Sequence, residues 1–292
     1  MKNSELKERW KDFKVSSLSG GLMRKRKIKS PFNMVDGIYQ DFRGITIDED
    51  IKKVDMTNID FTYSSFLKFS RFQECIFKNV LFVNSDMNHF KEHNCEFIEC
   101  LFENVELNNA KIGYGGSIYR NCIFRNCDFR KISIIKPEFT NCTFENCNLE
   151  GVDFNVSYFE NCKFIGNIND VWFRGDYAFP TDLKEYGTFR KNEMKNIDFS
   201  NTKLSWLTFT DGIPLNAIIL PDDKFIIYLE NKEKSITEAT KRVDQVFNDY
   251  KDKTLAIKIL NELLDETDPN QTEYIFSLED LNENYSLNEQ FL

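Results

Sequence analysis

Both histidines of the chain lie in a stretch that contains other types of metal ligand. His89, Glu92, His93 and Cys95 follow one another closely, and imidazole, carboxylate and thiolate groups are the ligands that Zn²⁺ takes in proteins. Ligands four residues apart on a helix converge, but adjacent residues of a strand point to opposite faces. Because the surrounding pattern is strand-like, we predict no metal ion and no cofactor.

Two other patterns that can support catalysis are incomplete. Residues 111–117 read Lys-Ile-Gly-Tyr-Gly-Gly-Ser, which has the glycines of a phosphate-binding loop but lacks its Lys-Ser/Thr pair and a following helix. No nucleophile motif accompanies the histidines, and no carboxylate pair stands out among the acidic residues. We therefore predict that the chain is not an enzyme and has no catalytic residues.

The cysteines share one position in a regular pattern. Each stands two residues before a large apolar residue, where Ser, Val, Ala or Thr stands otherwise. Residues two apart on a strand face the same side, so this small residue is predicted to face the interior. We interpret the thiols as reduced, buried core residues. They are Cys75, Cys95, Cys100, Cys122, Cys127, Cys142, Cys147 and Cys162.

The large apolar residues recur at every fifth position. A spacing of five keeps to one face of neither a strand nor an α-helix, so the chain must turn a corner every five residues. Cysteines also recur every twenty residues, which indicates that four corners complete one coil. The longest uninterrupted series is Tyr119, Phe124, Phe129, Ile134, Phe139, Phe144, Leu149, Phe154, Phe159 and Phe164.

These five-residue units resemble the pentapeptide-repeat family. Cys-Ile-Phe-Arg-Asn and Cys-Asn-Leu-Glu-Gly follow its pattern of a small residue, a polar residue, Leu or Phe, a polar residue and a turn residue. The resemblance covers roughly residues 51–174 and 187–209, and implies an all-β solenoid, a right-handed quadrilateral β-helix. About seven coils at ~4.8 Å each would make a rod on the order of 34 Å long.

The repeat has irregular places. The phase of the pattern shifts near residue 69, at 113–116 and at 167–171, where we predict bulges or loops. Glu92 occupies a central position that is otherwise apolar. We predict a local bulge there, in which Phe90 replaces Glu92 in the interior.

The flanking segments are predicted to cover the open ends of the solenoid. We divide the chain into a cap region at 1–50, a β-helix at 51–221 and a C-terminal hairpin, helix and acidic tail at 222–292. The tail is expected either to pack loosely or to be disordered.

Each flank has its own pattern. Leu6, Trp10 and Phe13 share one face of a predicted N-terminal helix, for which contact with a membrane surface is the alternative to capping. Residues 217–220 and 225–229 are expected to pair as a hairpin. A single helix with a capping box at Ser235 and Glu238 is expected to continue to Asp268.

An aromatic insertion at 175–188 interrupts the repeat. Loops on a rigid scaffold often carry function, and aromatic residues are enriched in protein interfaces. We therefore predict a binding surface made of Trp172, Tyr177, Phe179, Tyr186 and Trp206. The alternative is that these side chains only pack the loop onto the wall.

The charge of the chain is unevenly distributed. The net charge is −9, yet residues 51–174 contain 14 Lys and Arg against 16 Asp and Glu, whereas 222–292 contain 8 against 17. The Arg24-Lys25-Arg26-Lys27 run lacks interleaved aromatic residues, so we expect no nucleic-acid binding. Neither an apolar signal segment nor a membrane-length apolar run is found, so we expect a cytoplasmic protein without membrane contact.

These features predict a non-catalytic scaffold, monomer or homodimer, that binds a protein partner of unknown identity. The resemblance implies one alternative, because some members of the family protect DNA gyrase or topoisomerase IV from drugs or toxins by imitating DNA. The nearly neutral body argues against that alternative. Immunity to a co-produced toxin, and ligand binding near Glu92 or the insertion, are further alternatives.

Overall fold

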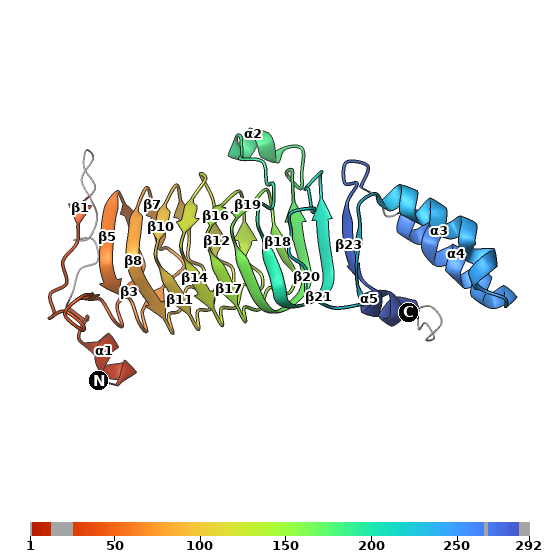
Figure 1. The fold of residues 1–292 in the computed structure, drawn as a ribbon. Helices are drawn as coiled ribbons and strands as arrows, with labels where there is room; N and C mark the ends of the chain where they lie inside the picture. Colours follow the sequence, from red (N-terminus) through yellow and green to blue (C-terminus); the bar gives the residue numbers. More distant parts are fainter. Residues whose placement is uncertain (1, 13–25, 266–267, 286–292) are drawn as a thin grey trace.

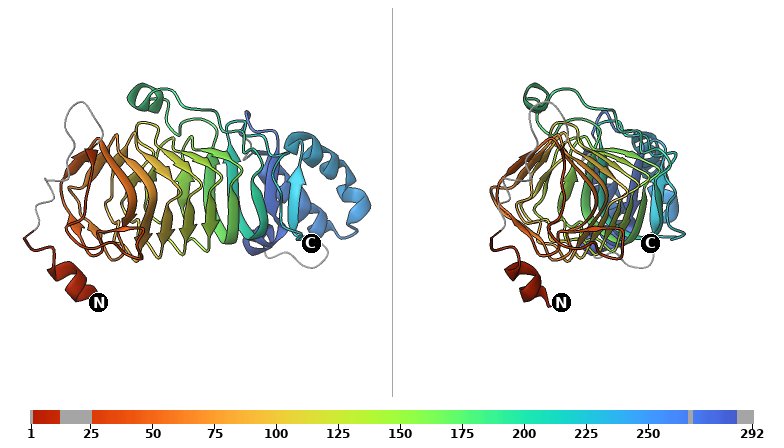
Figure 2. Two further views of the ribbon diagram at one scale, coloured as in Figure 1. Left: turned by 60° about the vertical axis from the view of Figure 1, so that its left-hand side comes forward. Right: turned by 90° about the vertical axis from the view of Figure 1, so that its left-hand side faces the viewer.

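The body of the protein is a right-handed quadrilateral β-solenoid of about seven coils (Figures 1 and 2). The computed structural model describes residues 2–12, 26–265 and 268–285. The strands of the solenoid are β1 (Arg26–Lys27), β2 (Gln40–Asp41), β3 (Thr46–Ile47), β4 (Asp50–Lys52), β5 (Val54–Asp60), β6 (Ser65–Phe66), β7 (Arg71–Gln73), β8 (Ile76–Val83), β9 (Glu92–His93), β10 (Glu96–Ile98), β11 (Leu101–Glu103), β12 (Lys111–Ile112), β13 (Ile118–Arg120), β14 (Ile123–Arg125), β15 (Ser133–Ile134), β16 (Glu138–Thr140), β17 (Thr143–Glu145), β18 (Val152–Phe154), β19 (Tyr158–Glu160), β20 (Lys163–Arg174) and β21 (Asp198–Thr210).

Neighbouring coils pair in parallel and in the register that the repeat predicts. Phe124 pairs with Phe144, and Phe144 with Phe164. Two exceptions coincide with predicted phase shifts: the coil between Ile51 and Phe72 has one residue more, and the coil between Phe97 and Tyr119 has two. Turns at 68–69 and 114–116 hold the extra residues. Parallel pairing already begins at Arg26, which pairs with Val54, before the repeat is recognisable in the sequence.

Columns of stacked aromatic rings fill the interior. On one side of the core, ring centroids of successive coils lie 4.8 Å apart for Phe82 and Phe102, 4.7 Å for Phe102 and Phe124, and 4.9 Å for Phe124 and Phe144. These spacings equal the separation of paired strands, so each ring packs flat against the next. A pair of such rings contributes about 0.5–1.5 kcal/mol beyond the burial of its area.

The cysteines occupy the interior beside these rings, as predicted. All eight are buried. The thiols of Cys122 and Cys142 each donate to a backbone carbonyl of the preceding coil, at 3.4 Å. Burial raises the pKa of Cys122, Cys142 and Cys162. The protonated thiol is a poor nucleophile, so these side chains serve packing.

Asparagines hold one corner of the solenoid. Asn141 donates its side-chain amide to Asn121 at 3.1 Å, and Asn161 donates to Asn141 at 3.1 Å. These residues have φ near +54°, a conformation that Asn tolerates better than most residues. Asn196 continues the ladder by donating to Asn161 at 2.9 Å. The insertion at 175–188 therefore leaves and rejoins the solenoid without interrupting this corner.

The N-terminal segment covers the first coil. After α1 (Asn3–Glu8), the Trp10 ring stacks on Phe42 at 5.6 Å, and its Nε1 donates to the carbonyl of Arg43 at 2.8 Å. Leu6 and Trp10 are buried, which confirms the predicted cap, while Phe13 lies outside the described residues.

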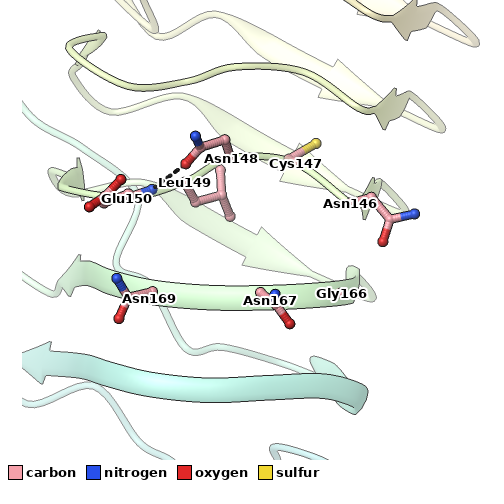
Figure 3. A pocket seen from close by; sticks show the side chains of 8 residues that line it. All are labelled: Asn146, Cys147, Asn148, Leu149, Glu150, Gly166, Asn167 and Asn169. Carbon is pink, nitrogen blue, oxygen red and sulfur yellow. Dashed lines mark hydrogen bonds between the residues drawn. The ribbon is translucent and has the colours of Figure 1, made fainter.

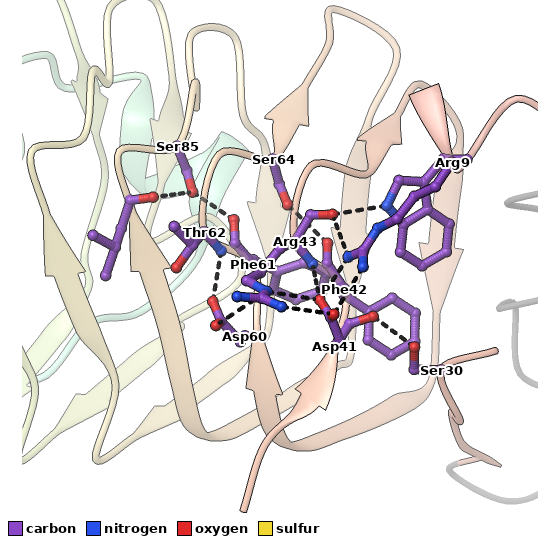
Figure 4. Close-up of polar contacts among 12 residues, drawn as sticks. Arg9, Ser30, Asp41, Phe42, Arg43, Asp60, Phe61, Thr62, Ser64 and Ser85 are labelled. Atoms are coloured by element: carbon purple, nitrogen blue, oxygen red, sulfur yellow. Dashed lines mark hydrogen bonds and ion pairs between the residues drawn. The ribbon is translucent and has the colours of Figure 1, made fainter. Parts of the chain in front are cut away.

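A buried carboxylate joins this cap to the coil (Figure 4). Arg9 donates to both oxygens of Asp41, at 2.8 and 2.6 Å, and Arg43 does so at 2.9 Å. Burial alone would raise the pKa of Asp41, but the hydrogen bonds from the two guanidinium groups outweigh it and hold the pKa well below its usual range. The ionised carboxylate thus fixes the N-terminal segment to the solenoid.

The C-terminal extension differs from the prediction. The expected hairpin of 217–220 with 225–229 is wrong, because Ile219 still belongs to the last coil and bridges Asp198. β22 (Ile226–Leu229) instead pairs antiparallel with β23 (Tyr274–Ser277). The tail continues as α5 (Leu278–Tyr285).

The expected single helix is also wrong. α3 (Lys232–Val246) and α4 (Tyr250–Asp265) lie side by side (Figures 1 and 2). Asn231, rather than Ser235, caps α3 by accepting from the N–H of Lys234 at 2.9 Å. Asp249 starts a new helix by accepting from the N–H of Lys251 at 2.8 Å. No helix in the described part of the chain has the length and apolar composition needed to span a membrane.

The stacked core yields the first prediction. Phe124→Ala should lower the free energy of unfolding by about 3–5 kcal/mol, because it removes one ring from the middle of a stack and leaves a cavity. Ile123 is a matched control, because it is adjacent but points outward with 37% of its surface exposed. Ile123→Ala should change the free energy by less than about 1 kcal/mol. Urea unfolding followed by circular dichroism measures both, and equal losses would contradict the prediction.

Candidate functional site

The predicted surface residues fall into two separate places. Tyr177 and Tyr186 lie at the insertion, whose helix α2 (Asp182–Tyr186) projects from one side of the solenoid (Figures 1 and 2). Trp172 lies on β20 and Trp206 on β21. Only the two tryptophans line a common cleft.

The tyrosines of the insertion hold it against the wall. Tyr177 is buried with Ile135 and Val156, and its hydroxyl donates to the carbonyl of Gly187 at 2.8 Å. The Tyr186 ring meets Tyr114 edge-on at 5.6 Å. These two side chains thus pack the insertion onto the wall of the solenoid, which was the alternative to a binding role.

Phe179 of the same insertion is free for contact. It is 66% exposed, the largest exposed fraction among the five predicted residues. It directly precedes Pro180 and the turn into α2. Phe179 belongs neither to the cluster around Tyr177 nor to the lining of the tryptophan cleft.

The tryptophans border a cleft between the last coil and the C-terminal extension. Trp172 and Trp206 are 36% and 38% exposed. The cleft has a volume of about 420 Å³, and β23, α5 and the end of α4 form its opposite side. Arg174 lies over the Trp172 ring at 4.7 Å and is held by Asp153 at 2.7 Å. A half-exposed aromatic wall of this kind is typical of protein-binding surfaces.

Side-chain oxygens from the C-terminal extension replace the coil that is missing at this end. Asp280, 9% exposed, accepts from the N–H of Trp206 and from the Ser205 hydroxyl, both at 2.7 Å. Asp268 accepts from the N–H of Asp211 at 2.6 Å. In earlier coils the N–H groups at such corners donate to the next coil, as Asn141 does to Glu160.

Side chains of the C-terminal extension also take the place of the missing coil along the last turn. Gln271 accepts from the N–H of Ile213 and donates to its carbonyl, both at 2.8 Å. Glu273 accepts from the N–H of Leu215. No local pattern indicates these pairings, since Asp268 ends the expected helix and the other three residues belong to a segment that is only generally acidic. They satisfy backbone groups that would otherwise be buried without partners.

Glu92 lies inside the solenoid, contrary to the prediction. It pairs with Phe72 and is only 2% exposed. Its carboxylate accepts from the N–H of Gly113, from the Ser117 hydroxyl and, at 3.3 Å, from the Tyr119 hydroxyl. The extra residues of the turn at 113–116 bring these donors into the core. Burial raises the pKa of Glu92 to about 7, although the donors oppose the shift.

Phe90 is buried as well and does not replace Glu92. Its ring centroid lies 5.3 Å from Phe72 and 5.7 Å from Phe66. Gly113 has φ of +85°, and a Cβ there would come within 2.3 Å of the Ile135 carbonyl, so only glycine fits this turn. In the described part of the chain, no three His, Cys, Asp or Glu side chains are grouped to hold a metal ion.

A polar recess marks the phase shift at 167–171 (Figure 3). It has a volume of about 420 Å³ and is lined by Asn146, Cys147, Asn148, Leu149, Glu150, Gly166, Asn167 and Asn169. Phe164 and Phe173 of β20 pair with Phe144 of β17 and Phe154 of β18. The stretch between the two residues of β20 is one residue shorter than the stretch between their partners. The only thiol, Cys147, is buried, so the recess offers hydrogen-bonding groups without a nucleophile.

Comparison with known proteins is consistent with this architecture. A family model described as pentapeptide repeats, in nine copies, matches residues 119–163. No curated protein matches the sequence.

Two solved structures have similar folds over most of their own length. HetL, a pentapeptide-repeat protein involved in heterocyst differentiation regulation from the cyanobacterium Nostoc sp. strain PCC 7120, is 7% identical, with a TM-score of 0.37 over 71% of this chain and 94% of HetL. QnrB1, a plasmid-mediated fluoroquinolone resistance protein, is 15% identical, with a TM-score of 0.30 over 59% of this chain and 92% of QnrB1.

The buried carboxyl group predicts an unusual pH dependence. The pKa of Glu92 is about 7 in the folded chain against 4.5 for the ordinary group, so the folded state favours the protonated form. Its contribution to stability is complete below pH ~4.5, and about 3 kcal/mol is lost as the pH rises to ~7. The other titratable groups that face it, Tyr119 and Cys95, have raised pKa values and stay neutral throughout this range.

Urea unfolding between pH 5 and pH 8 would measure this effect. Glu92→Gln should remove the fall in stability, so its difference from the natural chain should grow with pH. Glu99→Gln, at an exposed position, should leave the fall unchanged. Parallel pH profiles for Glu92→Gln and the natural chain would contradict the prediction.

Proposed function

We propose that this chain, a pentapeptide-repeat protein, is a non-catalytic scaffold that binds another protein. The observation that carries the proposal is the pair of half-exposed tryptophans beside the cleft at the end of the solenoid. Tryptophan is strongly enriched among the residues that dominate binding energy in protein interfaces. We further propose that the scaffold acts as a monomer or a homodimer.

The rigid body suits this role. The aromatic stacks and the asparagine ladder fix each coil to its neighbours, so the cleft has a firm wall on the solenoid side. A preformed surface loses less conformational entropy on binding than a mobile one. We further propose a cytoplasmic location, which suits reduced thiols in the core.

The environments of the side chains that could act as nucleophiles or bases support a non-catalytic role. Cys122, Cys142 and Cys162 are buried with raised pKa values. Glu92 is enclosed by the hydroxyl and amide groups that bind it. Groups that substrate cannot reach do not act as nucleophiles or bases.

Protection of a topoisomerase by DNA mimicry is less well supported. Basic residues are interleaved with the acidic residues on the outer faces: Arg125 lies between Glu103 and Glu145, at 3.4 and 2.7 Å. Arg190 binds Glu138 at 3.2 Å. A protein that imitates duplex DNA needs a continuous row of unpaired negative charge.

The tryptophan surface is tested by affinity capture with the full chain. Trp172→Ala combined with Trp206→Ala should reduce retention of the specific partner by about tenfold or more, since interface tryptophans commonly contribute 2 kcal/mol or more. Phe69→Ala is the matched control, because Phe69 is also aromatic and exposed but lies on a distant coil. Quantitative mass spectrometry should show partners retained by the control and lost by the double variant. An unchanged set of partners would overturn the proposal.

The alternative is tested by DNA supercoiling. Purified chain at micromolar concentration should neither inhibit gyrase nor protect it from a quinolone, because the mixed charges of the body offer no DNA-like face. A known protective pentapeptide-repeat protein serves as the positive control. Protection by this chain would favour the alternative function.

A further inference from the structure

The last strand of the solenoid has one paired edge and one open edge. Residues 201–210 of β21 pair with residues 165–174 of β20. On the other side, Asp198 bridges Ile219 and β23 packs beside β21, but no described strand forms a hydrogen-bonded ladder with this edge between Leu204 and Thr210. The chain departs toward the C-terminal extension before it can complete another coil (Figure 1).

The tryptophan cleft faces this open edge. The consecutive residues 206–210 of β21 all line it. Successive side chains of a strand point to opposite faces, so only the edge of the strand can present all of them to one cavity. The consecutive residues 274–277 of β23 line the cleft in the same way, while the other edge of β23 pairs with β22. Two strand edges therefore border the cleft.

The repeat determines which backbone groups point into it. In earlier coils, the central residue of a unit donates its N–H to the following coil, as Phe129 does to Asn148 at 2.9 Å and Phe66 to Asp86 at 2.8 Å. Phe209 holds the equivalent position in β21. Asp280 and Asp268 accept from the N–H groups of Trp206 and Asp211 on either side of it. The stretch between these two carboxylates faces the cleft.

The size and charge of the cleft limit what can enter. A strand residue occupies about 160 Å³ at a 3.3 Å rise, 4.8 Å strand spacing and ~10 Å sheet spacing, so the volume of about 420 Å³ takes two or three extended residues. Trp206, Phe276 and Leu281 give the cleft apolar walls. Lys232, Asp268 and Asp280 are the charged residues that line it, and the segment 222–292 around it is acidic, with 8 Lys and Arg against 17 Asp and Glu.

We propose that a short extended segment of a partner protein, apolar at its centre and basic on both sides, adds to the open edge of β21 in this cleft. Its backbone pairs with residues 207–210, and its central side chain packs against Trp206. Backbone pairing supplies affinity in such strand addition, while the side-chain pocket supplies selectivity. The inference rests on the proposed protein-binding function and specifies the form of the partner.

A labelled peptide of sequence Lys-Lys-Val-Ile-Val-Lys-Lys, blocked at both ends, tests the inference with the full chain. Fluorescence anisotropy should show binding, and N-methylation of its three central amides should weaken binding by about tenfold or more, because methylated amides cannot donate to a strand. Trp206→Ala should weaken binding to a similar extent, whereas Phe69→Ala should not. Hydrogen exchange should show new protection confined to residues 204–210.

The outcomes separate this inference from the proposed function. Equal binding of the methylated and unmethylated peptides, or no binding of either at millimolar concentration, would overturn strand addition. The tryptophan surface would then still stand if affinity capture depends on Trp172 and Trp206. Loss of that dependence would instead overturn the proposed function itself.

Discussion

Backbone hydrogen bonding between successive coils is the constraint on which the rest of the structure depends. Each coil donates to and accepts from its two neighbours, as Asn121, Asn141 and Asn161 show at one corner. The first and last coils have one neighbour each and must find other partners. At the N-terminal end, Arg9 and Trp10 donate to the carbonyl of Arg43. At the C-terminal end, four side chains accept from the backbone, which leaves the edge of β21 only partly covered.

The interior could be predicted because the same packing constraint applies in every coil. A five-residue period with large apolar centres requires corners, and the spacing of Cys122, Cys142 and Cys162 fixes the length of the coil. Stacked rings at strand spacing then follow without further information. The extra residues near 69 and at 113–116 also appeared as shifts of phase.

The exceptions could not be predicted because each depends on a contact made only once. Glu92 breaks the apolar pattern, and nothing local indicates that Gly113, Ser117 and Tyr119 would bind its carboxylate in the core. The pairing of β22 with β23 joins segments on either side of a helical pair, where the local pattern favoured a hairpin. The sequence indicated which aromatic residues could form a binding surface, but only the fold distinguished the packed tyrosines from the tryptophans of the cleft.

The asparagine ladder affects how this protein can evolve. Asn196 stacks on Asn161 as though the residues between them were absent, and Lys136 anchors the returning segment through the carbonyls of Tyr186 and Thr188. The segment that returns from the insertion is thus held at a fixed position on the solenoid. Recombination could exchange the insertion for segments of other length and composition while the coils on either side keep their register. The solenoid supplies a constant frame, and new specificities can arise by replacing one piece of its surface.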